Sequence, residues 1–373
     1  MTTQATHALV IGKFYPPHRG HHLLIDTAAA SCDQVSVVVM ASTQESVPLA
    51  SRVAWMQEAH AGAPNVTVVG IMDDVPVDYG DPAIWDQHIA LMRQALQTLV
   101  APAVTHVFTS ESYGAEMAHR FSARSVVLDR GRALVQTSST KIRRDVPGNW
   151  DFLSAPVRAG LAARIVVLGA ESSGTTTLSR DLVDRWRRRG GANSLTQWVP
   201  EFGREYTVAK LARSIARAQI EATSVPDLDD LAWHSDEFDL IARQQQRAEE
   251  GAAARGGPVL ICDTDVLATA VWHERYVGTW REDLIGLRHG RPPILYLITH
   301  HDGVPFEQDG LRDGEYRRAW MTRRFIEVLD AHGFPYHVLT GTREERAERA
   351  AVLIDTALKR HWNFAIPIVE RVK

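Results

Sequence analysis

Residues Ala8–Ile25 read ALVIGKFYPPHRGHHLLI, and this stretch decides the fold of the first half of the chain. It begins with an apolar run that predicts a strand, and its adjacent prolines exclude helix from the turn that follows. A strand that passes into a helix through a glycine-containing turn directs backbone N–H groups and the helix dipole at one spot, which favours phosphate binding. His18 and His21 lie on this turn, where their ring N–H groups can donate to a triphosphate.

The same histidines are compatible with two other interpretations. The turn could be a histidine-rich loop without function, or His18, His21 and His22 could form a metal site. No cysteine or carboxylate lies within the turn to complete a set of metal ligands. Phosphate binding is therefore the favoured hypothesis.

Short apolar runs alternate with helical patterns through the first half of the chain. Strands are expected at 8–11, 35–40, 66–69, 104–109 and 125–128, and helices at 20–31, 49–60, 83–100 and 112–121. Nearly continuous apolar strands that alternate with helices predict a doubly wound parallel sheet, covered on both faces. Ligands bind at the carboxyl ends of the strands in such sheets, which is where His18 and His21 would lie.

The composition narrows the class of protein. A chain of 373 residues is long enough for two domains, and its net charge of −4 does not favour nucleic-acid binding. The two cysteines, Cys32 and Cys262, cannot build a disulfide framework. Neither a signal peptide nor an apolar stretch of roughly 18 residues is present. A cytoplasmic protein without a membrane partner is therefore expected. Only five of the 41 Lys and Arg residues are lysines, which makes lysines in phosphate motifs informative.

A second anion motif, Thr137–Arg143 (TSSTKIR), closes the first half. Ser and Thr before a helical run are N-cap residues. A capped helix with Lys141 and Arg143 in its first turn can bind an anion, although an ordinary capped helix has the same pattern.

The two motifs together resemble the HxGH and S-x-T-x-I-R signatures of the nucleotidyltransferase superfamily. The resemblance implies that an acceptor phosphate attacks the α-phosphorus of ATP in line and that pyrophosphate leaves with Mg²⁺. Catalysis then rests on positioning and charge stabilisation. It implies catalytic roles for Lys13, His18, His21 and Arg143, and ATP contacts from Gly12, Phe14, Gly20, Ser139 and Thr140.

The resemblance also directs attention to the acceptor. Family members place adenine near the segment 108–114, which implies ATP contacts from Ser110 and Tyr113. Asp78, Trp85 and Arg52 are candidates for the acceptor site, and Trp85 could stack on a pyridinium ring. The alternatives are a core tryptophan and a surface ion pair.

The second half opens with another phosphate motif. Residues 145–164 contain two prolines and two glycines without a strong period, and are expected to connect two domains. A strand at 164–168 then leads into GAESSGTTT, residues Gly169–Thr177, and a helix through Arg189. The spacing is that of a P-loop, with Thr175 where lysine is usual and Thr176 at the Mg²⁺ position. Either arginines elsewhere supply the missing charge, or the domain is a remnant that binds nucleotide weakly.

Three further segments have the composition of kinase parts. Val259–Asp265 resembles a Walker B strand with Asp263 near Mg²⁺, and Glu201–Tyr206 combines an acid with an arginine. Gln308–Arg318 has the pattern of an arginine-bearing lid. Solvated ion pairs are the alternative for each segment. Strands at 294–299 and 336–339, with helices at 313–331 and 343–360, would complete a second parallel sheet.

The order of these motifs, with Trp150 and Val157-Arg158 between them, resembles the NadR-type bifunctional proteins over nearly the entire chain. They join a nicotinamide mononucleotide (NMN) adenylyltransferase to a ribosylnicotinamide kinase. The resemblance implies two doubly wound α/β domains, an HxGH Rossmann-like domain at 1–155 and a P-loop kinase-like domain at 160–373. The first would make NAD and pyrophosphate from NMN and ATP, and the second would phosphorylate nicotinamide riboside at its 5′-hydroxyl.

The implied kinase site has ATP, metal and acceptor parts. The ATP contacts are Gly169, Glu171, Ser172, Ser173, Gly174, Thr175, Thr176, Thr177 and Arg312. Thr176 and Asp263 would hold Mg²⁺, and Arg204 and Tyr206 would bind the riboside. Asp263 or Glu201 would accept the hydroxyl proton, and the sequence leaves that choice open.

Some relatives carry an additional repressor domain. Because the first strand is expected near residue 8, no DNA binding is expected, and homo-oligomer formation stays open. Two alternatives remain. The second domain could be a non-catalytic nucleotide-binding module, as Thr175 suggests, or the chain could be a coenzyme A pathway fusion of adenylyltransferase and kinase.

Overall fold

A computed structural model describes residues 5–288, 291–307 and 314–368. The described residues form two compact units. The first comprises the chain up to Gly160 together with the chain from Trp362 onward, and the second is Leu161–His361. The predicted second domain, 160–373, therefore includes a C-terminal segment that packs with the first unit. The reason is local hydrogen bonding, since Tyr15 Oη donates to the Ala365 carbonyl at 3.1 Å and the Ala365 N–H donates to Ser46 Oγ at 2.7 Å.

The first unit contains a parallel sheet with the strand order β3-β2-β1-β4-β5. Its strands are β1 His7–Gly12, β2 Gln34–Ala41, β3 Val66–Met72, β4 His106–Thr109 and β5 Arg124–Val127. Its helices include α1 Arg19–Ser31, α2 Leu49–Ala59, α3 Pro82–Gln97, α4 Gly114–Arg120 and α5 Ser139–Arg144. The chain order reverses between β1 and β4, which is where such a sheet binds its ligand.

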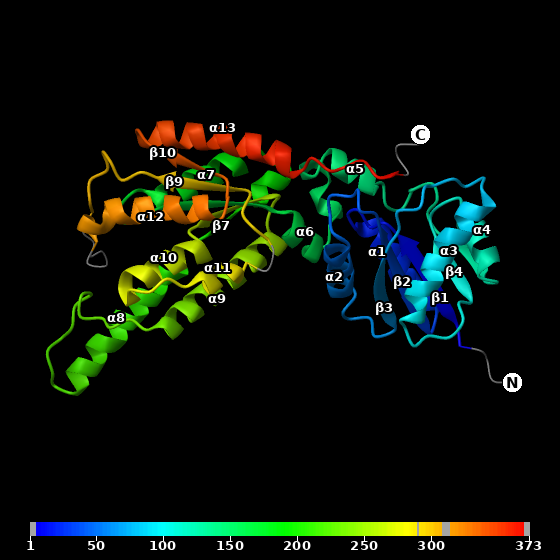
Figure 1. The fold of residues 1–373 in the computed structure, drawn as a ribbon, viewed down its shortest axis with the longest axis horizontal. Helices are drawn as coiled ribbons and strands as arrows, with labels where there is room; N and C mark the ends of the chain where they lie inside the picture. The colour runs from blue at the N-terminus through cyan, green and yellow to red at the C-terminus, as the bar shows by residue number, and fades with distance from the viewer. Residues whose placement is uncertain (1–4, 289–290, 308–313, 369–373) are drawn as a thin grey trace. The chain divides into compact units, whose positions relative to one another are not determined.

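Both faces of β2 are buried, which explains its continuous apolar run. Val37 and Val39 pack in one cluster with residues of α1 and α2, whereas Val38 and Met40 pack in another with residues of α3 and α4. Figure 1 shows α2 on one side of this sheet and α3 and α4 on the other. Side chains alternate between the faces of a strand, so a strand covered on both faces needs apolar residues throughout.

The segment 145–164 differs from the irregular connection that is expected for it. It contains a 3₁₀ helix at Pro147–Phe152 and the helix α6 at Ala155–Leu161. Trp150 and Val157 are almost completely buried. They belong to a buried series, Val146, Trp150, Leu153, Val157 and Leu161, whose spacing of three or four residues is a helical period. The prolines that obscure this period lie in the first turns of the two helices, where proline is tolerated.

The second unit contains a parallel sheet with the strand order β10-β9-β6-β8-β7. Its strands are β6 Ala163–Gly169, β7 Gln197–Val199, β8 Val259–Asp263, β9 Leu295–Thr299 and β10 Tyr336–Leu339. Its helices include α7 Thr175–Arg187, α8 Phe202–Ile220, α9 Ser235–Arg255, α10 Val266–Val277, α11 Glu282–Gly286, α12 Arg318–Ala331 and α13 Arg343–His361. The sequence patterns do not predict α9 to α11.

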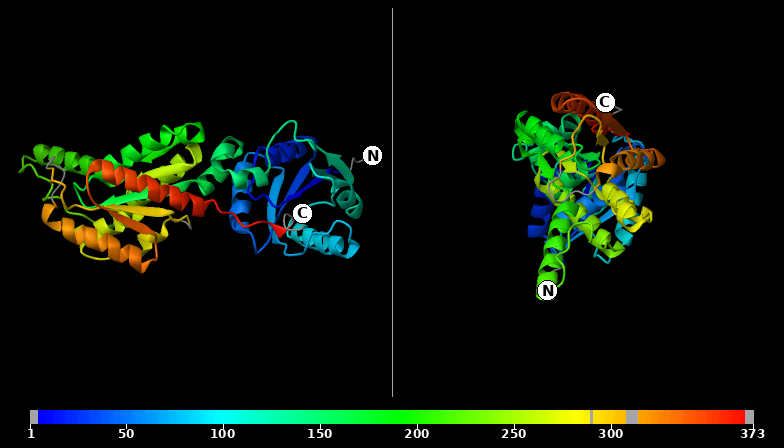
Figure 2. Two further views of the ribbon diagram at one scale, coloured as in Figure 1. Left: turned by 90° about the horizontal axis from the view of Figure 1, so that it is seen from above. Right: turned by 90° about the vertical axis from the view of Figure 1, so that its left-hand side faces the viewer.

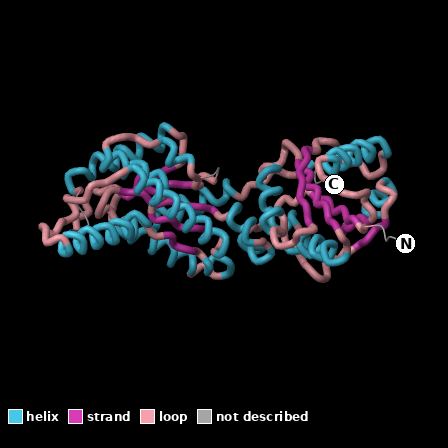
Figure 3. Tube along the Cα trace, turned by 90° about the horizontal axis from the view of Figure 1, so that it is seen from below, coloured by secondary structure: helices cyan, strands magenta, loops and turns pink. Residues whose placement is uncertain are grey.

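Helices cover both faces of the second sheet as well. In Figure 1, α13 lies above it and α9 and α10 lie below it, and Figure 2 shows α13 over the strands in the view from above. Figure 3 shows the strands of each unit enclosed by helices. The prediction of two doubly wound α/β domains is confirmed. In the part of the chain that the structure describes, no helix is long and apolar enough to cross a membrane.

Candidate active sites

A cavity of about 220 Å³ lies at the carboxyl ends of the strands in the first unit. Both sequence motifs of the first half contribute to its wall, together with Pro367 from the C-terminal segment. The predicted residues that line it are Lys13, His18, Gly20, His21, Ser110, Ser139, Thr140 and Arg143. The fold therefore brings the two motifs into one site.

His18 and His21 form a stacked pair at the start of α1, with ring centroids 3.7 Å apart. Nδ1 of His18 accepts from the Gly20 N–H at 3.1 Å, and Nδ1 of His21 accepts from the His18 N–H at 3.3 Å. Burial, reinforced by neighbouring positive charge, lowers the pKa of His18 to about 3 and that of His21 well below its usual range. Both rings are therefore neutral with the proton on Nε2, and each can act as a hydrogen-bond donor.

Gly20 is needed because the backbone approaches the His18 ring closely. A Cβ at this position would lie 3.1 Å from both Cε1 and Nδ1 of His18. A side chain would push the imidazole away from the N–H group that fixes its tautomer. The glycine between the two histidines thus preserves the orientation of the pair.

Cations line the same cavity. The Arg143 guanidinium lies 4.7 Å from the centre of the Tyr15 ring and donates to the Tyr15 carbonyl at 2.5 Å. Lys13 Nζ pairs with Glu45 at 2.8 Å. Arg132 also lines the cavity, although the sequence analysis does not single it out. In the sequence, the charged turn Asp129–Arg132 directly after an expected strand is the feature that could have indicated this role.

Arg52 is a structural residue in this geometry and does not line the cavity. Its side chain is fully buried, and its Nη1 donates to Glu45 at 2.6 Å while its Nε donates to the Val47 carbonyl at 3.0 Å. Glu45 in turn pairs with Lys13. Arg52 therefore contributes to the site by orienting Glu45, and it has no access to a substrate.

Trp85 also lies outside the cavity. It is 7% exposed, packs in the core with residues of α3 and α4, and donates from Nε1 to the Tyr79 carbonyl at 3.2 Å. Its surroundings match the alternative of a core tryptophan. Tyr113 stacks on Tyr79 with a centroid distance of 5.8 Å, and Asp78 accepts from the Gly80 N–H in a local turn. Gly12 and Phe14 are likewise absent from the described cavity wall, because the Phe14 ring packs into the core.

A chain of hydrogen bonds through two histidines lies behind this site and makes the stability of the folded protein sensitive to pH. Ser154 Oγ lies 3.1 Å from Nε2 of His22, whose Nδ1 lies 3.0 Å from Nε2 of His60, and His60 Nδ1 lies 3.2 Å from Asp26. Burial lowers the pKa of His22 to about 4. The unfolded chain gains this proton near pH 6.5, while the folded protein resists it until about pH 4.

We expect the free energy of unfolding to fall by ~3 kcal/mol between pH 6.5 and 4 through His22 alone. Thermal unfolding of the full chain at pH 7, 6, 5 and 4 measures this loss. The variant His22→Gln retains hydrogen-bonding capacity without titrating, so it should unfold with a shallower pH dependence. His119→Gln, at an exposed position of α4, is the control. Equal slopes for the three proteins would contradict the prediction.

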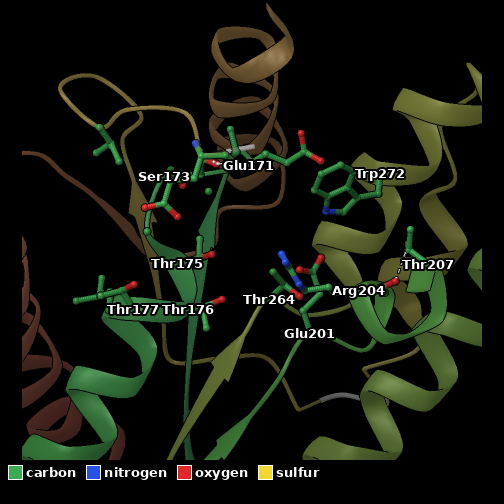
Figure 4. A pocket seen from close by; sticks show the side chains of 18 of the residues that line it. Glu171, Ser173, Thr175, Thr176, Thr177, Glu201, Arg204, Thr207, Thr264 and Trp272 are labelled. Carbon is green, nitrogen blue, oxygen red and sulfur yellow. Dashed lines mark hydrogen bonds between the residues drawn. The ribbon is translucent and has the colours of Figure 1, made fainter. Parts of the chain in front are cut away.

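The second unit has a larger cavity, of about 420 Å³. The whole P-loop, Gly169–Thr177, lines it, and so do Glu201 and Arg204. Figure 4 shows Thr175, Thr176 and Thr177 on one side of the cavity and Glu201 and Arg204 across from them. A Cβ on Gly169 would collide with the hydroxyl groups of Ser173 and Thr299, so the tight return of the loop onto β9 requires glycine here.

Thr176 and Asp263 lie together below the P-loop. Thr176 Oγ1 donates to Asp263 Oδ2 at 2.6 Å, and Asp263 Oδ1 is buried without a hydrogen-bond partner among the described residues. Burial raises the pKa of Asp263 to about 6. A hydroxyl and a carboxylate are the hard oxygen ligands that Mg²⁺ prefers, so the donor set fits that ion.

Glu201 lies at the start of α8 and faces the same cavity. Burial and the nearby charge of Asp263 raise the pKa of Glu201 to about 8, and Arg204 opposes part of this rise. The carboxyl groups of Glu201 and Asp263 therefore differ in their affinity for a proton. A carboxyl that can hold a proton near neutral pH is suited to acid–base chemistry.

Aromatic side chains form another wall of this cavity, which the sequence analysis does not anticipate. Trp233, Phe238, Trp272 and Tyr276 all line it. The rings of Trp272 and Tyr276 are stacked at 5.9 Å, and those of Trp233 and Tyr276 at 5.3 Å. The spacing of Trp272 and Tyr276, four residues apart on the helix after the Walker B strand, was the signal in the sequence.

Two predicted residues of the second site have other positions. Tyr206 does not line the described cavity wall, and its hydroxyl donates to Glu237 at 2.9 Å. Arg312 lies outside the described residues, as does most of the expected lid. Of that segment, Arg318 is described. Its Nη2 donates to the carbonyls of Ser172 and Val304, which fixes the outside of the P-loop.

Comparisons with known proteins agree with this arrangement. Residues 9–145 match the cytidylyltransferase-like family and residues 164–346 match an AAA domain. The trifunctional NAD biosynthesis/regulator protein NadR of Escherichia coli (strain K12) is 23% identical over 349 residues, covering 89% of this chain and 78% of that protein. The corresponding protein of Salmonella typhimurium is 22% identical, with coverage of 93% and 82%.

Two solved NadR structures share the fold across both units. One, in complex with NR, has a TM-score of 0.62 at 20% identity and covers 96% of this chain and 97% of its own. The other, in complex with NAD and AMP-PNP, has a TM-score of 0.64 at 20% identity and covers 98% of each chain. The chain has the two-domain layout of the NadR type. In this NadR-type layout, the cytidylyltransferase-like match contains His18 and Arg143, and the AAA match contains the P-loop and Asp263.

Proposed function

We propose that the first unit transfers the adenylyl group of ATP to NMN, and that the second unit makes NMN by phosphorylating nicotinamide riboside. The chain is then a bifunctional enzyme of NAD biosynthesis. The relatives are NAD biosynthesis proteins, and the ligands named for the solved structures are NR, NAD and an ATP analogue. The cavity described in each unit suits the reaction proposed for that unit. Both cysteines are free and buried, as in a cytoplasmic protein.

In the first unit, a phosphate oxygen of NMN bonds to the α-phosphorus of ATP while the bond from that phosphorus to the bridging oxygen breaks. The negative charge that develops on the phosphoryl oxygens needs donors already in place. His18 and His21 offer neutral Nε2–H groups, and Lys13 and Arg143 offer charge. None of these side chains needs to gain or lose a proton during the reaction.

In the second unit, the 5′-hydroxyl oxygen of the riboside bonds to the γ-phosphorus of ATP, ADP leaves, and the hydroxyl proton passes to a base. Glu201 is the better candidate for that base because it lines the cavity, whereas Asp263 is engaged by Thr176. Asp263 and Thr176 would hold Mg²⁺, which supplies charge neutralisation on the outer phosphates when bound.

The observation that carries the kinase proposal is the aromatic wall of the cavity that the P-loop also lines. Nicotinamide riboside has a flat, positively charged ring, and tryptophan and tyrosine faces attract such rings. Arg275 packs over one face of Trp272 and of Tyr276, so the riboside would use the opposite face. Trp272 and Tyr276 lie on α10 and line the same cavity as Glu201 and the P-loop, and Figure 4 shows Trp272 and Glu201 across from Thr175. The cavity therefore offers an aromatic face, a base and a phosphate loop.

Incubation of the full chain with ATP, Mg²⁺ and either nicotinamide riboside or NMN tests both halves of the proposal. Chromatography should show ADP and NMN or NAD from the riboside, and NAD with pyrophosphate from NMN. NAD from NMN alone would leave the second unit as a nucleotide-binding module, the alternative that Thr175 favours. Pantetheine phosphate as acceptor is the control for a coenzyme A enzyme and should give no product.

A further inference from the structure

The P-loop of the second unit has no side-chain cation of its own. Thr175 occupies the usual lysine position, and its Cγ2 is turned back toward the end of β6, where it would lie 2.9 Å from a Cβ placed on Gly169. In P-loop enzymes the lysine neutralises the outer phosphates. A nucleotide in this cavity therefore needs a cation from another element.

Arginine is the only cationic residue type in the described wall of this cavity, at positions 204, 343 and 346. Arg343 is already bound to Asp181 through two contacts of 2.7 and 2.6 Å, and its side chain is 71% exposed. Arg204 lies on the acceptor side and stabilises the charged forms of Glu201 and Asp263. This leaves Arg346 as the candidate for the positive charge that the lysine would otherwise supply.

Arg346 is held directly against the P-loop. It comes from α13, its Nε donates to the Gly341 carbonyl at 2.9 Å, and its Nη1 donates to the Ser173 carbonyl at 3.0 Å. These contacts fix the plane of the guanidinium group. The side chain of Arg318 contacts the neighbouring carbonyl of Ser172, but it is not part of the described cavity wall.

The charge of Arg346 is buried and uncompensated. The residue is 5% exposed, and its Nη2 is buried without a hydrogen-bond partner. Among the described residues no carboxylate pairs with it, and burial alone lowers its pKa. An arginine remains charged even so, and a buried cation without an anionic partner is costly until an anion reaches it.

We propose that Arg346 compensates for the missing P-loop lysine by placing its guanidinium charge next to the phosphate chain of the nucleotide bound in this cavity. The inference deepens the proposed function, because it rests on the second unit being an ATP-dependent kinase. A charge-assisted contact between arginine and phosphate is among the stronger hydrogen bonds in proteins.

The variant Arg346→Gln tests this role in the full chain, because glutamine can keep one contact to the loop carbonyls without the charge. Calorimetric titration with Mg-ADP should show affinity lower by about 10- to 100-fold, while competing adenosine binds with unchanged affinity. Arg349→Gln, at an exposed position one turn further along α13, should bind both ligands as the unmodified chain does. An equal loss for ADP and adenosine, or no loss, would overturn the inference.

A second variant separates charge from a merely structural role. If the charge at position 346 compensates for Thr175, then Thr175→Lys should restore much of the ADP affinity that Arg346→Gln loses. A loss of loop geometry would not respond to a lysine at position 175. The inference fails if Thr175→Lys binds ADP at least as well as the unmodified chain and yet gives no recovery in the double variant.

The two proposals fail in different ways. If the unmodified chain binds neither ATP nor ADP, the proposed kinase function fails. If the unmodified chain phosphorylates the riboside and Arg346→Gln changes neither the KM for ATP nor ADP binding, only the role of Arg346 fails. A raised KM for ATP with an unchanged KM for the riboside is the expected pattern.

Discussion

Replacement of His18 by asparagine should lower the kcat for adenylyl transfer to NMN about 100- to 1000-fold, the loss typical of a donor removed from a charge-stabilising site. Asparagine remains a good N-cap for α1, so the helix is preserved. It cannot reach the phosphates that the Nε2–H of His18 is positioned to meet. Measurement of NAD formation from NMN and ATP at saturating substrate gives the change in kcat.

The chain contains its own control for this experiment. Phosphorylation of nicotinamide riboside depends on the other unit and should be unchanged in His18→Asn. His119→Asn, at an exposed histidine of α4, should leave both activities intact. Comparable loss of both activities in His18→Asn would indicate a folding defect, and an unchanged kcat for adenylyl transfer would remove His18 from the site.

Glu201→Gln should reduce the kcat of the kinase about 100- to 10000-fold, which is the range for loss of a general base. Glutamine has nearly the same shape and cannot accept the hydroxyl proton. The KM for ATP should change much less than the kcat, because Glu201 lies across the cavity from Thr175 and Thr176 (Figure 4). Initial rates of ADP formation from the riboside measure the effect, with Glu205→Gln, exposed on α8, as the control.

The pH dependence provides a further readout for Glu201. A base works only after it has lost its proton, and the pKa of Glu201 is raised to about 8. The kcat/KM for the riboside should therefore rise with pH through the neutral range, reach half its maximum near pH 8 and level off about one pH unit higher. This rise should disappear in Glu201→Gln. If Glu201→Gln has the full kcat and the same dependence of kcat/KM on pH, Glu201 is not the base, and Asp263 becomes the candidate.

The sequence predicts those parts of the molecule that depend on local chemistry. The buried strands have continuous apolar runs, and His18, Arg143 and the P-loop follow turns with recognisable capping and glycine patterns. His18 and Arg143 meet in one cavity because parallel strands end at the same edge of a sheet. Two motifs that are far apart in the chain could therefore be assigned to one site in advance.

The remaining site residues depend on tertiary packing that no local pattern records. Trp85 and Arg52 have the residue types of a binding site, yet packing buries one in the core and binds the other to Glu45. Arg346 lies in the middle of an ordinary amphipathic helix, and only the placement of α13 brings it to the P-loop. A side chain that serves a site from a distant element is recognised only from the fold.

The C-terminal segment has a consequence for how the protein matures. The chain leaves the first unit after Gly160 and returns to it at Trp362, so the second unit is an insertion within a discontinuous first one. Pro367 lines the adenylyl-transfer cavity, and Ala365 bonds to Tyr15 and Ser46. During synthesis the inserted unit can fold as soon as it emerges, whereas the unit that is begun first is completed last.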